Sequence, residues 1–272
     1  MKKNQMMHGM LLLLGMAFVS CSQVTDLNPE NQDAQGQLSL ILNSNTDFLG
    51  ATRAAVNEES YKNTSNYDVV ILDKSNTERM NCKASEIESK MPITLPIGAY
   101  VVKAFYGTDA AYSRSAFYVY GEAQGTIKAE QRETITLNCT PTSGKITVNF
   151  DENMSNYYTD YKVFFKGTEA LGSDSISWTK TDTDPYYVKL NIGGETVKFA
   201  IHATAKDGFA NTNGATLGIK VGSFKLDRNK AYKMNVSANH TPTGDGAIDI
   251  KITIDETTEN KEYDIEVPVT WL

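Results

Sequence analysis

Apolar and polar residues alternate with a period of two along most of the chain, which is the pattern of half-buried β-strands. Leu38, Leu40 and Leu42 alternate with Gln37, Ser39 and Ile41. Further strands are predicted at Tyr67–Leu72, Tyr100–Tyr106, Phe117–Tyr120, Thr126–Ala129 and Thr134–Cys139. Turn-forming residues separate these segments. No long segment has a helical period, and Ala84–Lys90 forms at most a short helical turn.

The last part of the chain continues the alternation. Ile248, Ile250, Ile252 and Ile254 form a strand with one apolar face. A second alternation runs over Tyr263–Trp271, and Pro268 places it at a sheet edge or a bulge because proline cannot donate to a β-ladder. Long crossover helices, which a parallel sheet would require, are missing. We therefore predict an all-β fold of stacked antiparallel sheets.

The strand pattern occurs twice. The segment Gly125–Cys139 aligns without gaps on Gly222–Val236, and Tyr67–Val69 resembles Tyr161–Val163. Near the start, Gly36–Leu40 resembles Gly144–Val148. Because these matches keep a common order, we predict two tandem antiparallel β-sandwich domains, residues 36–143 and 144–272.

The first twenty residues have the parts of a lipoprotein signal peptide. Lys2 and Lys3 precede the apolar run Met10–Val19, and Ser20 stands directly before Cys21. The run is shorter than the roughly 20 residues that span a membrane. We predict cleavage of residues 1–20, lipidation of Cys21 and a flexible tether over residues 21–35. The alternative is a plain signal peptide in which Cys21 is incidental.

The composition and charge of the chain argue against several classes of function. The 272 residues carry a net charge of −7, and removal of a leader with two lysines and no acid leaves −9. An acidic protein of this kind lacks the basic surface that nucleic acid requires. Two of the three histidines, His202 and His240, lie outside the leader, and the sequence contains no catalytic or metal-binding motif. We expect a non-enzymatic protein without cofactor or metal. A hydrolase would need two distant carboxyl groups to converge in a pocket.

Two cysteines remain after the lipidation site. Export to an oxidising compartment would allow Cys82 and Cys139 to form a disulfide. The alternative is a pair of free thiols, with Cys139 acting as a small core residue. The spacing in the sequence does not decide between them.

Aromatic residues are dense over residues 105–120 and 157–161. Tyr118, Tyr120 and Trp178 are candidate glycan contacts, because rigid aromatic rings on β-sheets can stack on sugars. The alternative is that these rings only pack within the strands, where aromatics are favoured.

The segment Thr52-Arg53-Ala54-Ala55 follows the first predicted strand in a polar loop. A trypsin-like protease could cut between Arg53 and Ala54. The cut would detach the first strand and open a groove that a strand from another subunit could fill. The alternative is an ordinary exposed loop.

The leader, the Arg53 loop and the two β units together resemble fimbrillin-like lipoproteins of Bacteroidota. The segment Leu95–Ala104, followed by Phe117–Gly121, is closest to an uncharacterised domain-of-unknown-function family of two-domain β-sandwich lipoproteins. The resemblance implies transthyretin-like domains. It also implies processing at Arg53 and a donor strand at Asp264–Trp271.

The expected function is that of a lipid-anchored, non-enzymatic cell-envelope protein of the outer membrane. It would act as a structural or adhesive surface subunit, related to pili by strand exchange; the alternative is a surface glycan-binding module. Its expected partners are the membrane, through the lipid anchor, and other pilus or surface subunits or glycans. Since no tight acidic cluster follows Cys21, the side of the membrane stays open.

Overall fold

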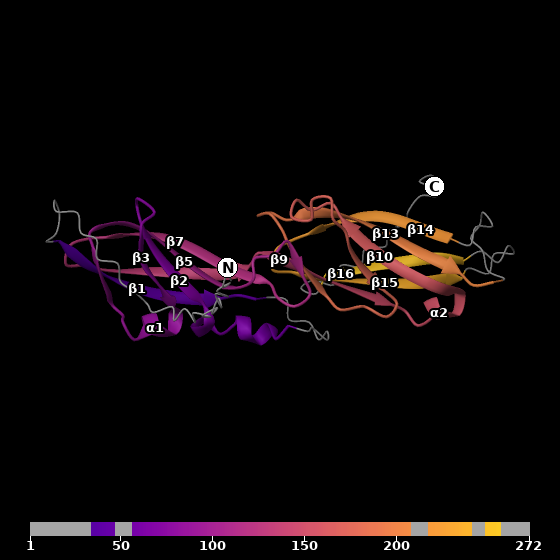
Figure 1. Ribbon diagram of the computed structural model, residues 1–272, viewed down its shortest axis with the longest axis horizontal. Helices are drawn as coiled ribbons and strands as arrows, with labels where there is room; N and C mark the ends of the chain where they lie inside the picture. Colours follow the sequence, from indigo (N-terminus) through magenta and orange to yellow (C-terminus); the bar gives the residue numbers. More distant parts are fainter. Residues whose placement is uncertain (1–33, 47–55, 208–216, 241–247, 257–272) are drawn as a thin grey trace, which may run out of the picture.

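The protein consists of two β-sandwich lobes arranged end to end, as Figure 1 shows. This computed structural model describes residues 34–46, 56–207, 217–240 and 248–256. The indigo-to-magenta part of the chain forms one lobe and the orange-to-yellow part forms the other. The predicted fold of two tandem β-sandwiches is confirmed.

The first lobe contains β1 (Gln35–Ser44), η1 (Glu58–Tyr61), η2 (Thr64–Asn66), β2 (Asp68–Asp73), β3 (Glu78–Lys83), α1 (Ala84–Glu88), β4 (Ile93–Pro96), β5 (Gly98–Gly107), β6 (Tyr112–Ser113), β7 (Tyr118–Ile127) and β8 (Arg132–Pro141). The second lobe contains β9 (Ser143–Phe150), α2 (Met154–Tyr157), β10 (Tyr158–Lys166), β11 (Ile176–Thr179), β12 (Tyr186–Lys189), β13 (Glu195–Ala205), β14 (Leu217–Leu226), β15 (Ala231–His240) and β16 (Ile248–Glu256).

The strands of the first lobe follow the order β3-β2-β5-β7-β8-β1-β4. β7 and β8 pair only at Val119 with Pro141 and Tyr120 with Thr140, and there the strand order passes from one layer of the sandwich to the other. The layer β3-β2-β5-β7 is antiparallel throughout. In the other layer, β1 is antiparallel to β4 but parallel to β8.

The second lobe repeats this arrangement. The order β11-β10-β13-β14 matches β3-β2-β5-β7, and β12-β9-β15 matches β4-β1-β8. Again one pair, β9 with β15, is parallel. Two strands are added at the edges: β16 pairs with β15, and the short β6, which comes from the first half of the chain, pairs with β12. The sandwiches are therefore mostly antiparallel, with one parallel pair in each.

The gapless alignment of the two hairpins is off by two residues. Glu130 and Asn229 both have φ of 58° and occupy equivalent places in the β7–β8 and β14–β15 turns. This equivalence corresponds to an offset of 99 rather than 97. A two-residue shift leaves every side chain on the same face of its strand, so the alternation could not reveal it.

Each lobe has its own apolar core. The first is built on residues such as Leu38, Val69 and Val102, and the second on residues such as Val163, Phe165 and Trp178, all of them without exposed surface. Tyr187 lies on β12 of the second lobe but packs in the core of the first. The lobes are thus joined by buried apolar contact as well as by the chain.

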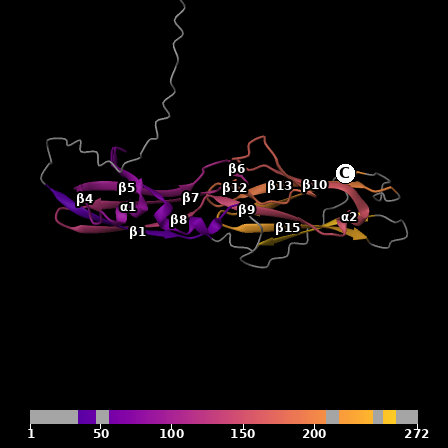
Figure 2. The same cartoon turned by 60° about the horizontal axis from the view of Figure 1, so that its bottom comes forward.

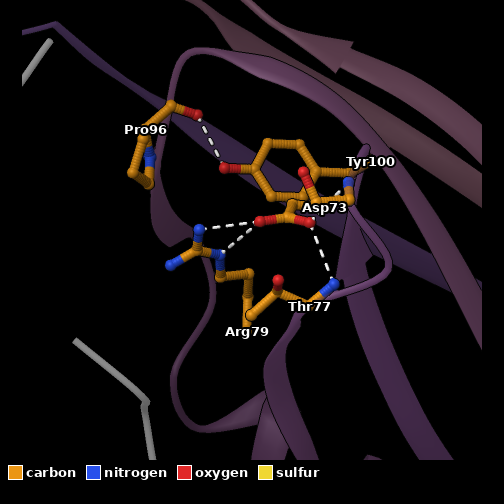
Figure 3. Close-up of polar contacts among 6 residues, drawn as sticks. Asp73, Thr77, Arg79, Pro96 and Tyr100 are labelled. Atoms are coloured by element: carbon orange, nitrogen blue, oxygen red, sulfur yellow. Dashed lines mark hydrogen bonds and ion pairs between the residues drawn. The ribbon is translucent and has the colours of Figure 1, made fainter. Parts of the chain in front are cut away.

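The β2–β3 hairpin is closed by the carboxylate of Asp73, shown in Figure 3. One oxygen accepts hydrogen bonds from the backbone N–H of Ser75 (2.8 Å) and Thr77 (3.0 Å). The other accepts from Nε (3.0 Å) and Nη2 (2.7 Å) of Arg79. Beside them, the Tyr100 hydroxyl donates to the Pro96 carbonyl at 2.9 Å. Burial raises the pKa of the Asp73 carboxyl, but the Thr77, Arg79 and Ser75 donors outweigh it and hold the pKa below its ordinary value.

Replacing Asp73 with alanine should lower the free energy of unfolding at pH 7 by about 1.5–3 kcal/mol, because several charge-assisted hydrogen bonds are lost. Since the folded pKa is lowered, this stabilisation is present above the unfolded pKa and disappears as the pH falls through the folded pKa. Urea unfolding from pH 7 down to pH 2.5 measures the difference. The control is Asp68→Ala, which breaks the exposed pair with Lys83. A difference that does not change with pH would show that the charge of Asp73 is unimportant.

Candidate functional site

β1 is an internal strand of its layer, between β8 and β4. In this register, Leu38 lies opposite Glu133 of β8 and opposite Ile93 of β4. Leu38 has no exposed surface and Leu40 is 6% exposed. Because β1 pairs on both sides, its removal would leave two strand edges unpaired and apolar surface uncovered.

The end of β1 is tied to a buried tyrosine. Ser44 Oγ donates to the Tyr61 carbonyl at 2.7 Å and lies 2.8 Å from the Tyr67 hydroxyl, which donates to the same carbonyl at 2.6 Å. Burial raises the pKa of Tyr67 to about 12, although the Ser44 hydrogen bond lowers it. The hydroxyl is therefore protonated and able to donate near neutral pH.

Three aromatic rings connect this region to the second lobe. The Tyr61 and Phe117 rings stack with centroids 3.7 Å apart and an interplanar angle of 19°. Phe117 in turn stacks on Tyr187 of β12, with centroids 4.9 Å apart. The stack continues the core of the first lobe across the boundary between the lobes.

A buried ion pair lies beside the stack. Lys145 Nζ on β9 donates to Glu58 Oε1 on η1 at 2.7 Å, and the Tyr187 hydroxyl donates to the same oxygen. The side chain of Lys145 is 2% exposed and that of Glu58 is 9% exposed. Burial raises the pKa of Tyr187, and the Glu58 carboxylate raises it further, so this hydroxyl remains a donor. Since each charge would be costly to bury alone, the pair favours the arrangement in which both lobes are joined.

Arg114, in the β6–β7 connection, reaches across to the second lobe. Its Nη1 donates to the Asp182 carboxylate at 2.8 Å and to the Asp184 carbonyl at 2.7 Å, and its Nη2 donates to the Ser177 carbonyl at 3.0 Å. The guanidinium carbon lies 3.9 Å from the centroid of the Tyr186 ring. This planar group thus uses both its hydrogen-bond donors and its flat face in one contact.

The chain passes between the lobes through Thr142, which separates β8 from β9. Its N–H donates to the Tyr118 carbonyl at 2.9 Å, and its carbonyl accepts from Leu190 N–H at 3.0 Å. Figure 2 shows β8 leading into β9, with β6 and β12 nearby. We call Glu58, Arg114, Phe117, Lys145 and Tyr187 the junction. Its contacts hold the lobes in a defined relation instead of leaving them on a free linker.

Phe105, Tyr118 and Tyr120 form an aromatic row on the outer face of the β5–β7 pair. Phe105 lies opposite Tyr120 in the ladder. The ring centroids of Tyr118 are 5.9 Å from Phe105 and 6.2 Å from Tyr120. Each ring is half-buried, and the Tyr120 hydroxyl donates to Glu122. The row therefore covers the sheet and still presents aromatic surface to solvent.

A cavity of about 300 Å³ lies near the junction and contains two carboxylates among its lining side chains. Both oxygens of Glu195 accept backbone hydrogen bonds, from Glu169 N–H at 2.7 Å and Asn191 N–H at 2.8 Å. Glu169 Oε2 accepts from Asn191 Nδ2 at 2.6 Å. These groups bind the neighbouring loops to each other.

Trp178 is not a surface residue, and its prediction as a glycan contact is wrong. It has no exposed surface. Its ring meets Phe165 and Tyr186 edge to face, and its Nε1 donates to the Asp184 carbonyl at 2.8 Å. A ring enclosed in this way cannot stack on a sugar. Tyr118 and Tyr120 do lie on an outer face, so their role as glycan contacts stays a prediction.

The bond between Cys82 and Cys139 is not formed. Cys139 is a buried free thiol. In the strand order, β2, β5 and β7 lie between the strands of the two cysteines, and Cys139 Sγ packs 3.9 Å from the Ala104 carbonyl oxygen. Burial raises the pKa of the Cys139 thiol to about 11, which keeps it protonated and unreactive near neutral pH.

Three predicted site residues, Cys21, Arg53 and Ala54, lie outside the described residues. Conversely, sequence reasoning missed Glu58, Arg114 and Lys145. Lys145 offered no signal, because it stands in phase with the polar residues Thr147 and Asn149 of an alternating strand. Glu58 and Arg114 occur in polar segments and offered none.

Within the part of the chain that the structure describes, no cluster of three or more His, Cys, Asp or Glu could hold a metal ion. The helices of the same residues are too short or too polar to cross a bilayer. A role for the chain can be argued from three features: the junction, the aromatic row, and the place of β1 between β4 and β8, which we call the β1 groove.

The fold and these features define a two-lobed β-sandwich protein with an internal first strand. Residues 34–269 match the family described as Domain of unknown function (DUF4493). Because the match extends over most of its length, the chain belongs to this family, as the sequence predicted. No curated protein matches the sequence.

The solved structures that this chain resembles share little sequence with it. A fimbrial assembly protein from Parabacteroides distasonis is 12% identical, with 84% of this chain and 97% of that chain covered and a TM-score of 0.44. A candidate polysaccharide-binding protein (DUF1812) from Bacteroides thetaiotaomicron is 13% identical, with 85% and 98% covered and a TM-score of 0.45. The fimbrial anchor protein Mfa2 from Porphyromonas gingivalis is 14% identical, with 80% and 97% covered and a TM-score of 0.36. A role for this chain has to be argued from its own residues.

Replacing Glu58 with alanine should lower the free energy of unfolding by about 3–5 kcal/mol, because the change leaves the Lys145 ammonium buried without its partner. The matched control is Glu59→Ala, which breaks the exposed pair with Lys62 and should cost at most about 1 kcal/mol. Denaturant unfolding measures both. In the double variant Glu58→Leu, Lys145→Met much of the stability should return. Equal effects of Glu58→Ala and Glu59→Ala would contradict a stabilising role for the buried pair.

Proposed function

We propose that this chain is a non-enzymatic cell-envelope subunit with a structural or adhesive role at the bacterial surface. It would be anchored in the outer membrane through lipid on Cys21. Cleavage after Arg53 would allow a strand from another subunit to replace β1. This proposal goes beyond family membership, and it is supported by the place of β1 in the fold.

The observation that carries the proposal is that β1 is internal in its layer but precedes every other described strand in the chain. A single cut between residues 46 and 56 would break the peptide chain between β1 and the rest of its lobe. The equivalent strand β9 continues from β8 through Thr142 and into α2, so no single cut could free it. Only the first lobe is therefore arranged for strand exchange.

The residues that follow the proposed cut have contacts besides those with β1. Val56 is 8% exposed, and Glu58 is bound by Lys145 and Tyr187 of the second lobe. A chain that begins at Ala54 would therefore keep the junction.

The vacated groove would bind a partner mainly through backbone hydrogen bonds to β4 and β8, as in other cases of β-strand addition. Buried apolar side chains would add roughly 1.5–3 kcal/mol each. Such a contact is suited to assembly outside the cell, because it needs neither a cofactor nor an energy source.

Surface material from a Bacteroidota host that expresses the chain should contain a form that begins at Ala54, identified by peptide mass spectrometry. Arg53→Ala should abolish this form and leave the full lipidated chain, because a trypsin-like protease requires the basic residue. The matched control is Lys62→Ala, which removes the nearby basic residue at the end of η1 and should leave processing unchanged. An intact chain beginning at Cys21 in assembled material would contradict processing.

The aromatic row favours glycan binding as a second candidate function, because its half-exposed rings lie on an outer sheet face. Tyr118→Ala and Tyr120→Ala should each weaken binding on a glycan array about tenfold, if stacking contributes the roughly 1–1.5 kcal/mol of an aromatic contact. Tyr112→Ala, at an exposed ring outside the row, is the control. Equal binding by all variants would rule out the row as the contact surface.

A further inference from the structure

We propose that the β1 groove selects its partner by a glycine. The partner is a strand of another subunit that runs parallel to β8 and carries glycine two residues before its first buried apolar residue. This inference rests on the proposed strand exchange, and it names the class of strand that the groove accepts.

Gly36 sits where no side chain fits. A Cβ at this position would lie 2.2 Å from the Lys128 carbonyl oxygen, 2.7 Å from Ile127 Cγ2 and 3.0 Å from the Gln131 carbonyl oxygen. Two of these three neighbours are backbone atoms of the β7–β8 turn, which cannot rotate away as a flexible side chain could. We call this site the glycine notch.

The notch is held closed by hydrogen bonds to β1 itself. Gln37 N–H donates to the Gln131 carbonyl and Glu130 N–H donates to the Gln35 carbonyl, both at 2.8 Å. Moving the turn outward to admit a side chain would break these two bonds. A larger residue therefore either clashes or loses the contacts that start the strand.

The second lobe has a similar but less tight approach at the equivalent position. Gly144 on β9 occupies the place of Gly36, and a Cβ there would lie 3.0 Å from the Asp227 carbonyl oxygen in the β14–β15 turn. Lys145 N–H donates to the Lys230 carbonyl at 2.9 Å. In both lobes a glycine thus stands where the first strand passes under a hairpin turn, and the approach is much closer at Gly36 than at Gly144.

Beyond the notch, the groove accepts apolar side chains at alternate positions. Leu38 and Leu40 point into the core and are 0% and 6% exposed, whereas Gln37 is exposed. The direction is fixed as well, because β1 is parallel to β8 and antiparallel to β4. The partner strand should therefore have the sequence pattern Gly-x-apolar-x-apolar when it runs parallel to β8.

This requirement also bears on a segment near the end of the chain. The segment Tyr263–Trp271 has the required alternation but no glycine. If it filled the whole groove of another copy, a bulky residue or no residue at all would stand at the notch. A subunit with a glycine-led strand is the better partner.

The test uses the full chain, cut between residues 53 and 54 by limited proteolysis, and a fluorescent peptide with the sequence of β1, Gln35–Ser44. Incorporation is measured by comigration with the folded protein. The amount of incorporated peptide should fall at least about tenfold for Gly36→Ala, because overpacking a fixed site is unfavourable. The matched control is Gln37→Ala, at the exposed neighbouring position, which should match the native peptide. A Tyr263–Trp271 peptide should be incorporated weakly.

Different outcomes overturn the glycine notch and strand exchange. Incorporation of the Gly36→Ala peptide or the Tyr263–Trp271 peptide as readily as the native one would overturn the glycine notch and leave strand exchange intact. If even the native peptide is not incorporated, strand exchange itself is overturned, and selection of a partner with it.

Discussion

The first lobe depends on the pairing of β1 with two strands at once. Its backbone groups pair with β8 on one side and β4 on the other, and its leucines cover the core between the layers. Buried backbone groups need partners, so a sandwich without this strand would have two open edges and an uncovered core. Everything proposed about partners follows from the fact that such a strand lies at the beginning of the described chain.

The two lobes share a strand order but differ in the fate of the equivalent strand. β9 is fixed at both ends by the chain, and its lobe carries the additional edge strands β6 and β16. The junction joins the lobes through buried rings and the Glu58–Lys145 pair. In the proposed exchange, the second lobe and the junction would stay in place while the first strand of the other lobe is replaced.

Much of the fold was predictable from the sequence, because alternation identifies strands directly. Tyr100–Tyr106 corresponds to β5, and Ala84–Lys90 contains the short α1. The parallel pairing of β1 with β8 was not predictable, since alternation specifies which side chains face inward and not the direction of the neighbouring strand. The burial of Trp178 could have been inferred, because it alternates with Ile176 across Ser177 and therefore shares the apolar face of that strand.

The candidate site was harder to predict from the sequence, because its residues lie far apart along the chain. Glu58 and Lys145 are 87 residues apart and meet only once both lobes have formed. The glycine notch depends on how closely a hairpin turn approaches β1, which sequence periodicity does not describe. Cys139 shows the same limit, since its surroundings on β8 and not its spacing from Cys82 determine its state.

Hydrogen–deuterium exchange on the full chain, before and after a cut between residues 53 and 54, tests most directly whether β1 can be replaced. Amides of β9 are the internal reference, because β9 occupies the equivalent place in the second lobe. We expect β1 and β9 to be similarly protected in the intact chain, and we expect the cut to lower the protection of β1 and leave that of β9 unchanged. Protection of β1 that equals that of β9 after the cut would contradict an exchangeable first strand.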